Sequence, residues 1–281
     1  MSQNENAIKP VDSPVKEGLA GLGSAFVTIG TTYPITKLIY RQILENENAA
    51  KSLTKLRQEG YVIVYRGIMP VMVQKCLCLP TMFAVYSAAT IPLKSLNMNE
   101  YLEKTCASVI SGTLEAFLMP FERVQLILLM SQYNNQFRNM FHLIRVMAKD
   151  YGFKEFFRGY TTILTRNICS NCCFFLTKSE LQKRFDNADH VYMKHMQNFV
   201  YGALVGTLIT VLMYPLKVAK VHIQKDLGGK YRNLLEVSRE IYQTNSRGMI
   251  NFYRGIEVNT LKGLLSWGIT NSSYEWIKHR L

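Results

Sequence analysis

The chain has 281 residues, of which 48% are hydrophobic and 19% charged, and its formal net charge is +13. Globular domains average about a quarter charged residues, so this chain carries less charge than usual, and most of that charge is basic. The composition excludes a disordered chain and a small disulfide-bonded secreted scaffold, and it argues against an ordinary soluble domain.

The first residues mix acidic and basic side chains, which predicts a disordered tail over residues 1–15 with no signal peptide or presequence. Residues 18–36 and 196–216 then carry no charge, and residues 67–93 carry only Lys75. A helix that crosses a bilayer needs about 20 mostly apolar residues. In chain order we expect six such helices, over residues 16–44, 66–93, 99–131, 158–184, 194–225 and 256–279.

One motif, Gly-x4-aromatic-Arg-Gly, occurs three times and ends at Gly67, Gly159 and Gly255. Similar motifs at a nearly fixed interval indicate a chain built from copies of one unit. Each unit reads as a helix that contains a proline, a polar loop with a short helix, and a second helix. We therefore expect three repeats, over residues 16–95, 96–186 and 187–281.

The loops inside the repeats, over residues 37–66, 123–158 and 217–254, hold most of the Lys and Arg. Because these bases are spread between apolar spans, they favour attraction to a membrane surface over nucleic-acid binding. Basic loops stay on the cytoplasmic side of a bacterial membrane, which corresponds to the mitochondrial matrix. Six spans then place both termini on the opposite side.

Three bases lie deep inside predicted spans, one in each repeat: Lys75, Arg166 and Lys262. Charges at this depth are costly and usually face a water-filled path. Each base lies about 12 Å into its helix at a rise of 1.5 Å per residue. At that depth a side chain reaches the lipid interface by snorkelling only in a strained conformation, which disfavours this alternative. Three cations around one axis suit a substrate that carries phosphates.

The chain shows no pattern that predicts an enzyme or a bound cofactor. No Gly-x-Gly-x-x-Gly follows a strand and no Walker loop occurs. No Ser/His/Asp or Cys/His set with the spacing of a known catalytic motif is present either. Cys169, Cys172 and Cys173 lack a second pair at zinc-finger spacing, so we expect no metal site.

The repeats resemble the mitochondrial carrier family, whose signature is Pro-x-acid-x-x-base followed by Gly-x4-aromatic-base-Gly. The second half is met three times, whereas the first half is degraded in this chain. Residues 65–75, 120–125 and 266–275 look like its triple-repeat subfamily, which contains a mitochondrial NAD transporter.

The resemblance implies an all-α membrane protein with six transmembrane helices in three pseudo-threefold repeats and short matrix helices. It implies alternating-access transport of NAD+ across the mitochondrial inner membrane by a monomer, with both termini towards the intermembrane space. The alternatives are a carrier of another nucleotide or coenzyme-type anion, mitochondrial or peroxisomal, and a carrier-fold protein that binds without transporting.

The resemblance also assigns candidate substrate-binding residues, namely Gln74, Lys75, Arg166, Asn167 and Lys262. Glu115 lies in an otherwise uncharged stretch, where a lone carboxylate needs a partner. Two roles stay equally open: contact with the positively charged nicotinamide end of NAD+, or a salt bridge to Arg166 or Lys75.

Positions two and five after each proline share a helix face. In carriers the acid of one repeat meets the base of the next, which implies a matrix gate that pairs Glu122 with Lys220 and Thr36 with Gln125, and sets Lys217 opposite Ile39. An outer gate would use Glu275 and Lys278. The implied hinges are Pro34, Pro120 and Pro215, and the Arg-Gly turns are implied sites for cardiolipin as a structural lipid.

Overall fold

The computed structural model describes residues 14–77, 100–185, 204–244 and 248–280, and the regular structure within these residues is helical. Parts of the second and fifth predicted spans, and the predicted repeat boundaries near residues 95 and 186, lie outside the described residues. Most of the predicted tail lies outside them as well.

The helices form three successive groups with the same order: a long or broken helix, a short helix, a tight turn and a further helix. The first group comprises α1 (Pro14–Leu44), α2 (Ala49–Glu59), α3 (Tyr61–Val64) and a helix over 68–77. The second comprises α5 (Glu100–Ala116), α6 (Met119–Leu129), α7 (Met140–Val146) and α8 (Tyr160–Phe185). The third comprises Leu204–Leu212, α10 (Tyr214–Gln224), α11 (Leu234–Gln243) and α12 (Ile256–Lys278). Short 3-10 or π segments cover Ser131–Tyr133, Met147–Tyr151, Phe153–Phe157 and Gly248–Tyr253.

The three prolines that precede the loops affect their helices differently. Pro120 and Pro215 are the second residues of α6 and α10. The helical conformation is interrupted by turn residues just before each of these helices. Leu204–Leu212 and α10 meet at an angle of 53°. Proline fits the first turn of a helix, where its missing N–H is not needed. Pro34 instead lies inside the continuous helix α1.

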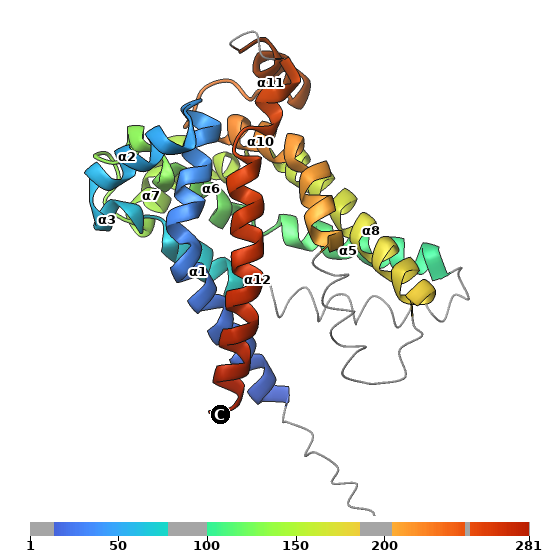
Figure 1. The fold of residues 1–281 in the computed structure, drawn as a ribbon. Coiled ribbons are helices and arrows are strands. Elements are labelled where there is room, and N and C mark those ends of the chain that lie inside the picture. The colour runs from blue at the N-terminus through green and yellow to red at the C-terminus, as the bar shows by residue number, and fades with distance from the viewer. Residues whose placement is uncertain (1–13, 78–99, 186–203, 245–247, 281) are drawn as a thin grey trace, which may run out of the picture.

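Helices from the two ends of the chain pack against each other. Figure 1 shows α1 and α12 side by side along their length, and α5 and α8 likewise. Small residues allow the close approach: a Cβ on Gly112 would lie 3.2 Å from the backbone nitrogen of Ile168 in α8. The pair α1–α12 thus joins the first and third repeats.

The Arg-Gly turns and the short helices α2, α7 and α11 lie at one end of the bundle, which we call the turn end (Figure 1). The glycines of these turns have φ values near +80°, a conformation that favours glycine. A Cβ on Gly67 would also lie 2.8 Å from the Tyr33 hydroxyl. The turn end holds much of the buried core, which includes Ile39, Leu126, Tyr214 and Val218.

The arginine of each Arg-Gly turn donates hydrogen bonds to backbone carbonyls of the next repeat. Arg66 reaches the carbonyls of Tyr133, Asn134 and Phe137. Arg158 reaches those of Asp226 and Gly229, and Arg254 reaches that of Asn46. Because the third repeat returns to the first, these bonds tie the three groups of helices into a closed ring at the turn end.

By length and composition, no individual helix within the described residues qualifies as a membrane span, although the bent pair Leu204–Leu212 and Tyr214–Gln224 does.

Candidate functional site

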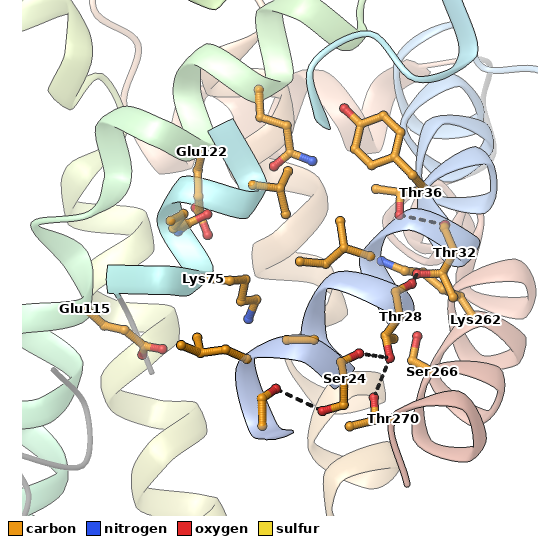
Figure 2. Close-up of a pocket in the computed structure, with 18 of the residues that line it drawn as sticks. Ser24, Thr28, Thr32, Thr36, Lys75, Glu115, Glu122, Lys262, Ser266 and Thr270 are labelled. Atoms are coloured by element: carbon orange, nitrogen blue, oxygen red, sulfur yellow. Dashed lines mark hydrogen bonds between the residues drawn. The ribbon is translucent and has the colours of Figure 1, made fainter. Parts of the chain in front are cut away.

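A cavity of about 960 Å³ lies between the helix groups. Its lining includes all six residues that the sequence singled out as substrate-binding: Gln74, Lys75, Glu115, Arg166, Asn167 and Lys262. These residues come from the helix over 68–77, α5, α8 and α12, so all three groups contribute. Figure 2 shows Lys75, Glu115 and Lys262 around this space.

The charges in the cavity combine three cations with carboxylates. Lys75, Arg166 and Lys262 each line the cavity, which none of them would do if it pointed outward into lipid. Glu115 and Glu122 also line it. The site can therefore hold an anionic group beside a group that carries positive charge.

Most of the residues predicted for the matrix gate lie in or next to the cavity lining. Thr36, Glu122 and Gln125 line the cavity, and Lys220 of α10 donates a hydrogen bond to Glu122 of α6. Lys220 is only 4% exposed. This pair crosses from the second to the third repeat, next to the part of the cavity that Glu122 lines.

The other two gate contacts are not ion pairs. Thr36 donates to the Thr32 carbonyl at 3.1 Å, and no hydrogen bond within the described residues joins it to Gln125. Lys217 donates to Asn259 of α12, in its own repeat. Asn259 was not anticipated from the sequence, although its place in the first turn of α12 faces the end of α10 that carries Lys217.

The outer-gate candidates lie in the last turns of α12. Tyr274 lines the cavity, the Glu275 side chain is exposed, and Lys278 Nζ lies 6.0 Å from the centre of the Tyr274 ring. The positions equivalent to Glu275 and Lys278 in the first repeat lie outside the described residues, and those in the second repeat, Ser179 and Gln182, are described only as part of α8.

A buried ionic cluster lies beside the Glu122–Lys220 pair, since one of its members, Arg123, follows Glu122 in α6. Arg123, which is 0% exposed, donates to Glu155 at 2.5 Å and to the Asp226 carbonyl at 2.7 Å. Arg158 Nε lies 3.3 Å from the same Glu155 carboxylate. The cluster joins the second repeat to the third, and the sequence carries no signal for it because Arg123 lies 32 residues from Glu155.

A row of hydroxyl groups along α1 was also missed. Ser24, Thr28 and Thr32 follow one another at intervals of four residues and line the cavity. Ser266 and Thr270 of α12 line it beside them (Figure 2). The available signal was the four-residue spacing of hydroxyls within an uncharged stretch, which places them on one helix face.

Comparisons with known proteins agree with this geometry. A sequence profile described as Mitochondrial carrier protein matches residues 97–189 and 192–281. Two mitochondrial nicotinamide adenine dinucleotide transporters of Homo sapiens are each 33% identical over 265 residues, which cover 94% of this chain and 89% of theirs. Solute carrier family 25 member 53 of Homo sapiens is 26% identical over 268 residues, covering 92% of this chain and 86% of its own.

Proposed function

Because this chain belongs to the mitochondrial carrier family, we propose that it transports NAD+ across the mitochondrial inner membrane by alternating access. The observation that carries the proposal is the convergence of Lys75, Arg166 and Lys262 with Glu115 on one cavity. Members of this family are transporters rather than enzymes, and the proposal needs no bound cofactor.

The charge pattern of the cavity suits a dinucleotide. NAD+ carries a pyrophosphate and a positively charged nicotinamide ring, so it presents both signs of charge. The three cations attract the pyrophosphate, and Arg166 can bind two of its oxygens at once. Ligand cavities commonly measure about 300–1,000 Å³, and a cavity of about 960 Å³ belongs to the large end of that range.

Glu115 favours NAD+ over a substrate that carries only negative charge, because a carboxylate repels further anions and attracts the nicotinamide cation. A salt bridge from Glu115 to Arg166 or Lys75 is the rival role. Replacing Glu115 with Gln lowers NAD+ uptake and leaves folding intact if Glu115 contacts the substrate. Unchanged uptake would remove Glu115 from the site.

We place six transmembrane helices in three repeats, over residues 16–95, 96–186 and 187–281, with a tail over 1–15. The turn end faces the matrix, because the basic loops lie there, and both termini face the intermembrane space. Rocking of the repeats about Pro34, Pro120 and Pro215 then breaks the Glu122–Lys220 pair and opens the cavity to the matrix. Glu275 and Lys278 act in the outer gate.

Cardiolipin is the proposed structural lipid at the Arg-Gly turns of a monomeric carrier. The side chains of Arg66 and Arg158 are engaged with carbonyls of the next repeat, so they hold protein rather than lipid. The backbone N–H groups at the starts of α8, α12 and the helix over 68–77 are the donors left for a lipid phosphate.

A binding protein that does not transport is the second candidate, and the single ion pair in the gate favours it. Another nucleotide or coenzyme-type anion, carried in a mitochondrion or a peroxisome, would use the same cations. Uptake of labelled NAD+ into liposomes containing the purified protein separates these functions. A transporter fills the vesicles, and Arg166→Gln abolishes filling while Arg57→Gln, at an exposed position of α2, does not. If NAD+ raises the melting temperature of the protein but no labelled NAD+ enters the liposomes, the protein binds NAD+ without transporting it, which would contradict transport.

A further inference from the structure

The cavity has two walls that differ in chemistry (Figure 2). Lys75, Arg166, Glu115 and Glu122 come from the helix over 68–77, α5, α6 and α8, and they supply charge. The wall formed by α1 and α12 carries Lys262 near the gate and otherwise supplies mainly hydroxyl groups, from Ser24, Thr28, Thr32, Thr36, Ser266 and Thr270.

The hydroxyls of α1 have already used their hydrogens. Thr28, Thr32 and Thr36 each donate to the carbonyl one turn back, over 2.8, 2.7 and 3.1 Å, and Ser24 donates to the Gly21 carbonyl over 2.9 Å. Because a carbonyl oxygen can only accept, chemistry alone fixes the direction of these bonds. What these side chains can offer to a ligand is therefore lone pairs.

The same holds for Thr270 on α12. Its Oγ1 lies 2.8 Å from Thr28 Oγ1. Since the hydrogen of Thr28 is directed at the Ser24 carbonyl, Thr270 is the donor in this contact and its hydrogen is used as well. The contact also fixes α1 against α12 at this level of the cavity.

An independent feature indicates that the cavity receives a polar ligand. Asn167 lines the cavity and is only 7% exposed. Its side-chain amide makes no hydrogen bond to another residue within the described part of the chain. Because no other described residue bonds to this amide, water or a ligand in the cavity must supply its partner. A ligand that carries both donors and acceptors satisfies this amide.

We propose that the hydroxyls of α1, together with Thr270 of α12, form an acceptor surface that receives hydrogen-bond donors of the substrate, such as sugar hydroxyls and amino or amide groups. The inference deepens the proposed transport of NAD+ and rests on it. Phosphate and carboxylate oxygens find no donor among the α1 hydroxyls, so they turn to the cations. The two walls together orient the substrate and select nucleotides, which carry many donors, over di- and tricarboxylates, which carry few or none.

Thr32→Val tests the acceptor surface, because valine keeps the shape of threonine and removes its lone pairs. Thr32→Ser restores the acceptor. Thr31→Val is the matched control, since Thr31 makes the same backbone contact at 2.9 Å from an exposed position that does not line the cavity. NAD+ affinity is measured from the thermal shift of detergent-purified protein against NAD+ concentration, at several ionic strengths.

We expect Thr32→Val to weaken NAD+ binding roughly threefold to tenfold, the worth of one neutral hydrogen bond. The dependence on salt stays that of the wild type, because no charge is lost, whereas Arg166→Gln makes it shallower. Thr32→Ser recovers the affinity and Thr31→Val leaves it unchanged.

Unchanged affinity in Thr32→Val, an altered salt dependence in that variant, or equal weakening in Thr31→Val would each overturn the acceptor surface. Failure of NAD+ to stabilise the wild-type protein at any ionic strength would instead overturn the proposed function, and the acceptor surface for NAD+ with it.

Discussion

The second and third repeats meet at the turn end through buried ion pairs, whereas between the third and first repeats Arg254 donates a hydrogen bond to a backbone carbonyl. Arg123, Glu155 and Arg158 form an ionic cluster between the second and third repeats, beside the Glu122–Lys220 pair. Between the third and first repeats, Arg254 donates to the Asn46 carbonyl, and Lys217 turns to Asn259 of its own repeat. Equivalent positions of one repeated unit therefore form two different junctions.

The difference teaches that three helix groups with the same order of elements need not meet through equal contacts. Removing one partner of a buried ion pair costs about 3–5 kcal/mol, because the remaining charge stays buried without compensation. A single hydrogen bond from a charged group, such as that of Arg254 to a carbonyl, contributes about 1.5–3 kcal/mol. We expect the turn end to separate first between the third and first repeats, and the Glu122–Lys220 pair between the second and third repeats to break last.

Breaking the ionic cluster should give the largest effect on stability. Arg123→Ala leaves Glu155 buried beside fewer cations, so we expect a loss of about 3–5 kcal/mol in the free energy of unfolding. Arg232→Ala is the control, because Arg232 pairs with Asp226 and Glu240 near the surface, where such pairs contribute about 0–1 kcal/mol. Thermal unfolding in detergent measures both, and equal losses would show that the cluster has no special role.

The gate pairs should differ next. A double-mutant cycle on the free energy of unfolding, with Glu122→Gln and Lys220→Met, should give a coupling energy of about 1–3 kcal/mol. Such a value is expected for residues in direct contact. The equivalent cycle with Thr36→Val and Gln125→Leu should give a coupling below about 0.5 kcal/mol, since no hydrogen bond joins that pair. Similar coupling energies in the two cycles would contradict the asymmetric gate.

The smallest effect concerns the tyrosines before the prolines of the first and third repeats. Tyr33 donates to the Arg66 carbonyl, and Tyr214 to the Arg254 carbonyl, each over 2.9 Å. Tyr33→Phe should lower the free energy of unfolding by about 1 kcal/mol. Tyr65→Phe should leave the free energy of unfolding unchanged. The ring centres of Tyr65 and Tyr33 lie 6.2 Å apart, and the Tyr65 hydroxyl makes no hydrogen bond within the described residues. A larger loss in Tyr65→Phe would contradict this order.

The sequence indicated the cavity better than it indicated the contacts around it. Lys75, Arg166 and Lys262 stood out because a charge deep in an apolar span has few tolerable positions, and in the structure all three line one cavity. The resemblance to carriers likewise implied a pair of Glu122 with Lys220, and these two residues are hydrogen-bonded in the structure.

The remaining features carry no comparable signal. Arg123 and Glu155 are 32 residues apart, and only the packed fold brings them together. Hydroxyls spaced by four residues occur in many helices, so Thr28 and Thr32 stood out only once they lined the cavity. Pro34 follows the same pattern as Pro120 and Pro215, yet α1 continues through it. Local sequence does not decide whether a proline interrupts its helix.

The central claim is that one cation from each repeat holds a single substrate in a common cavity. The most direct test measures the NAD+-induced thermal shift of Lys75→Gln, Arg166→Gln and Lys262→Gln separately. The account predicts that each variant folds and that each loses most of the shift, because all three side chains line the same space. A full shift in any one of these variants would contradict the claim.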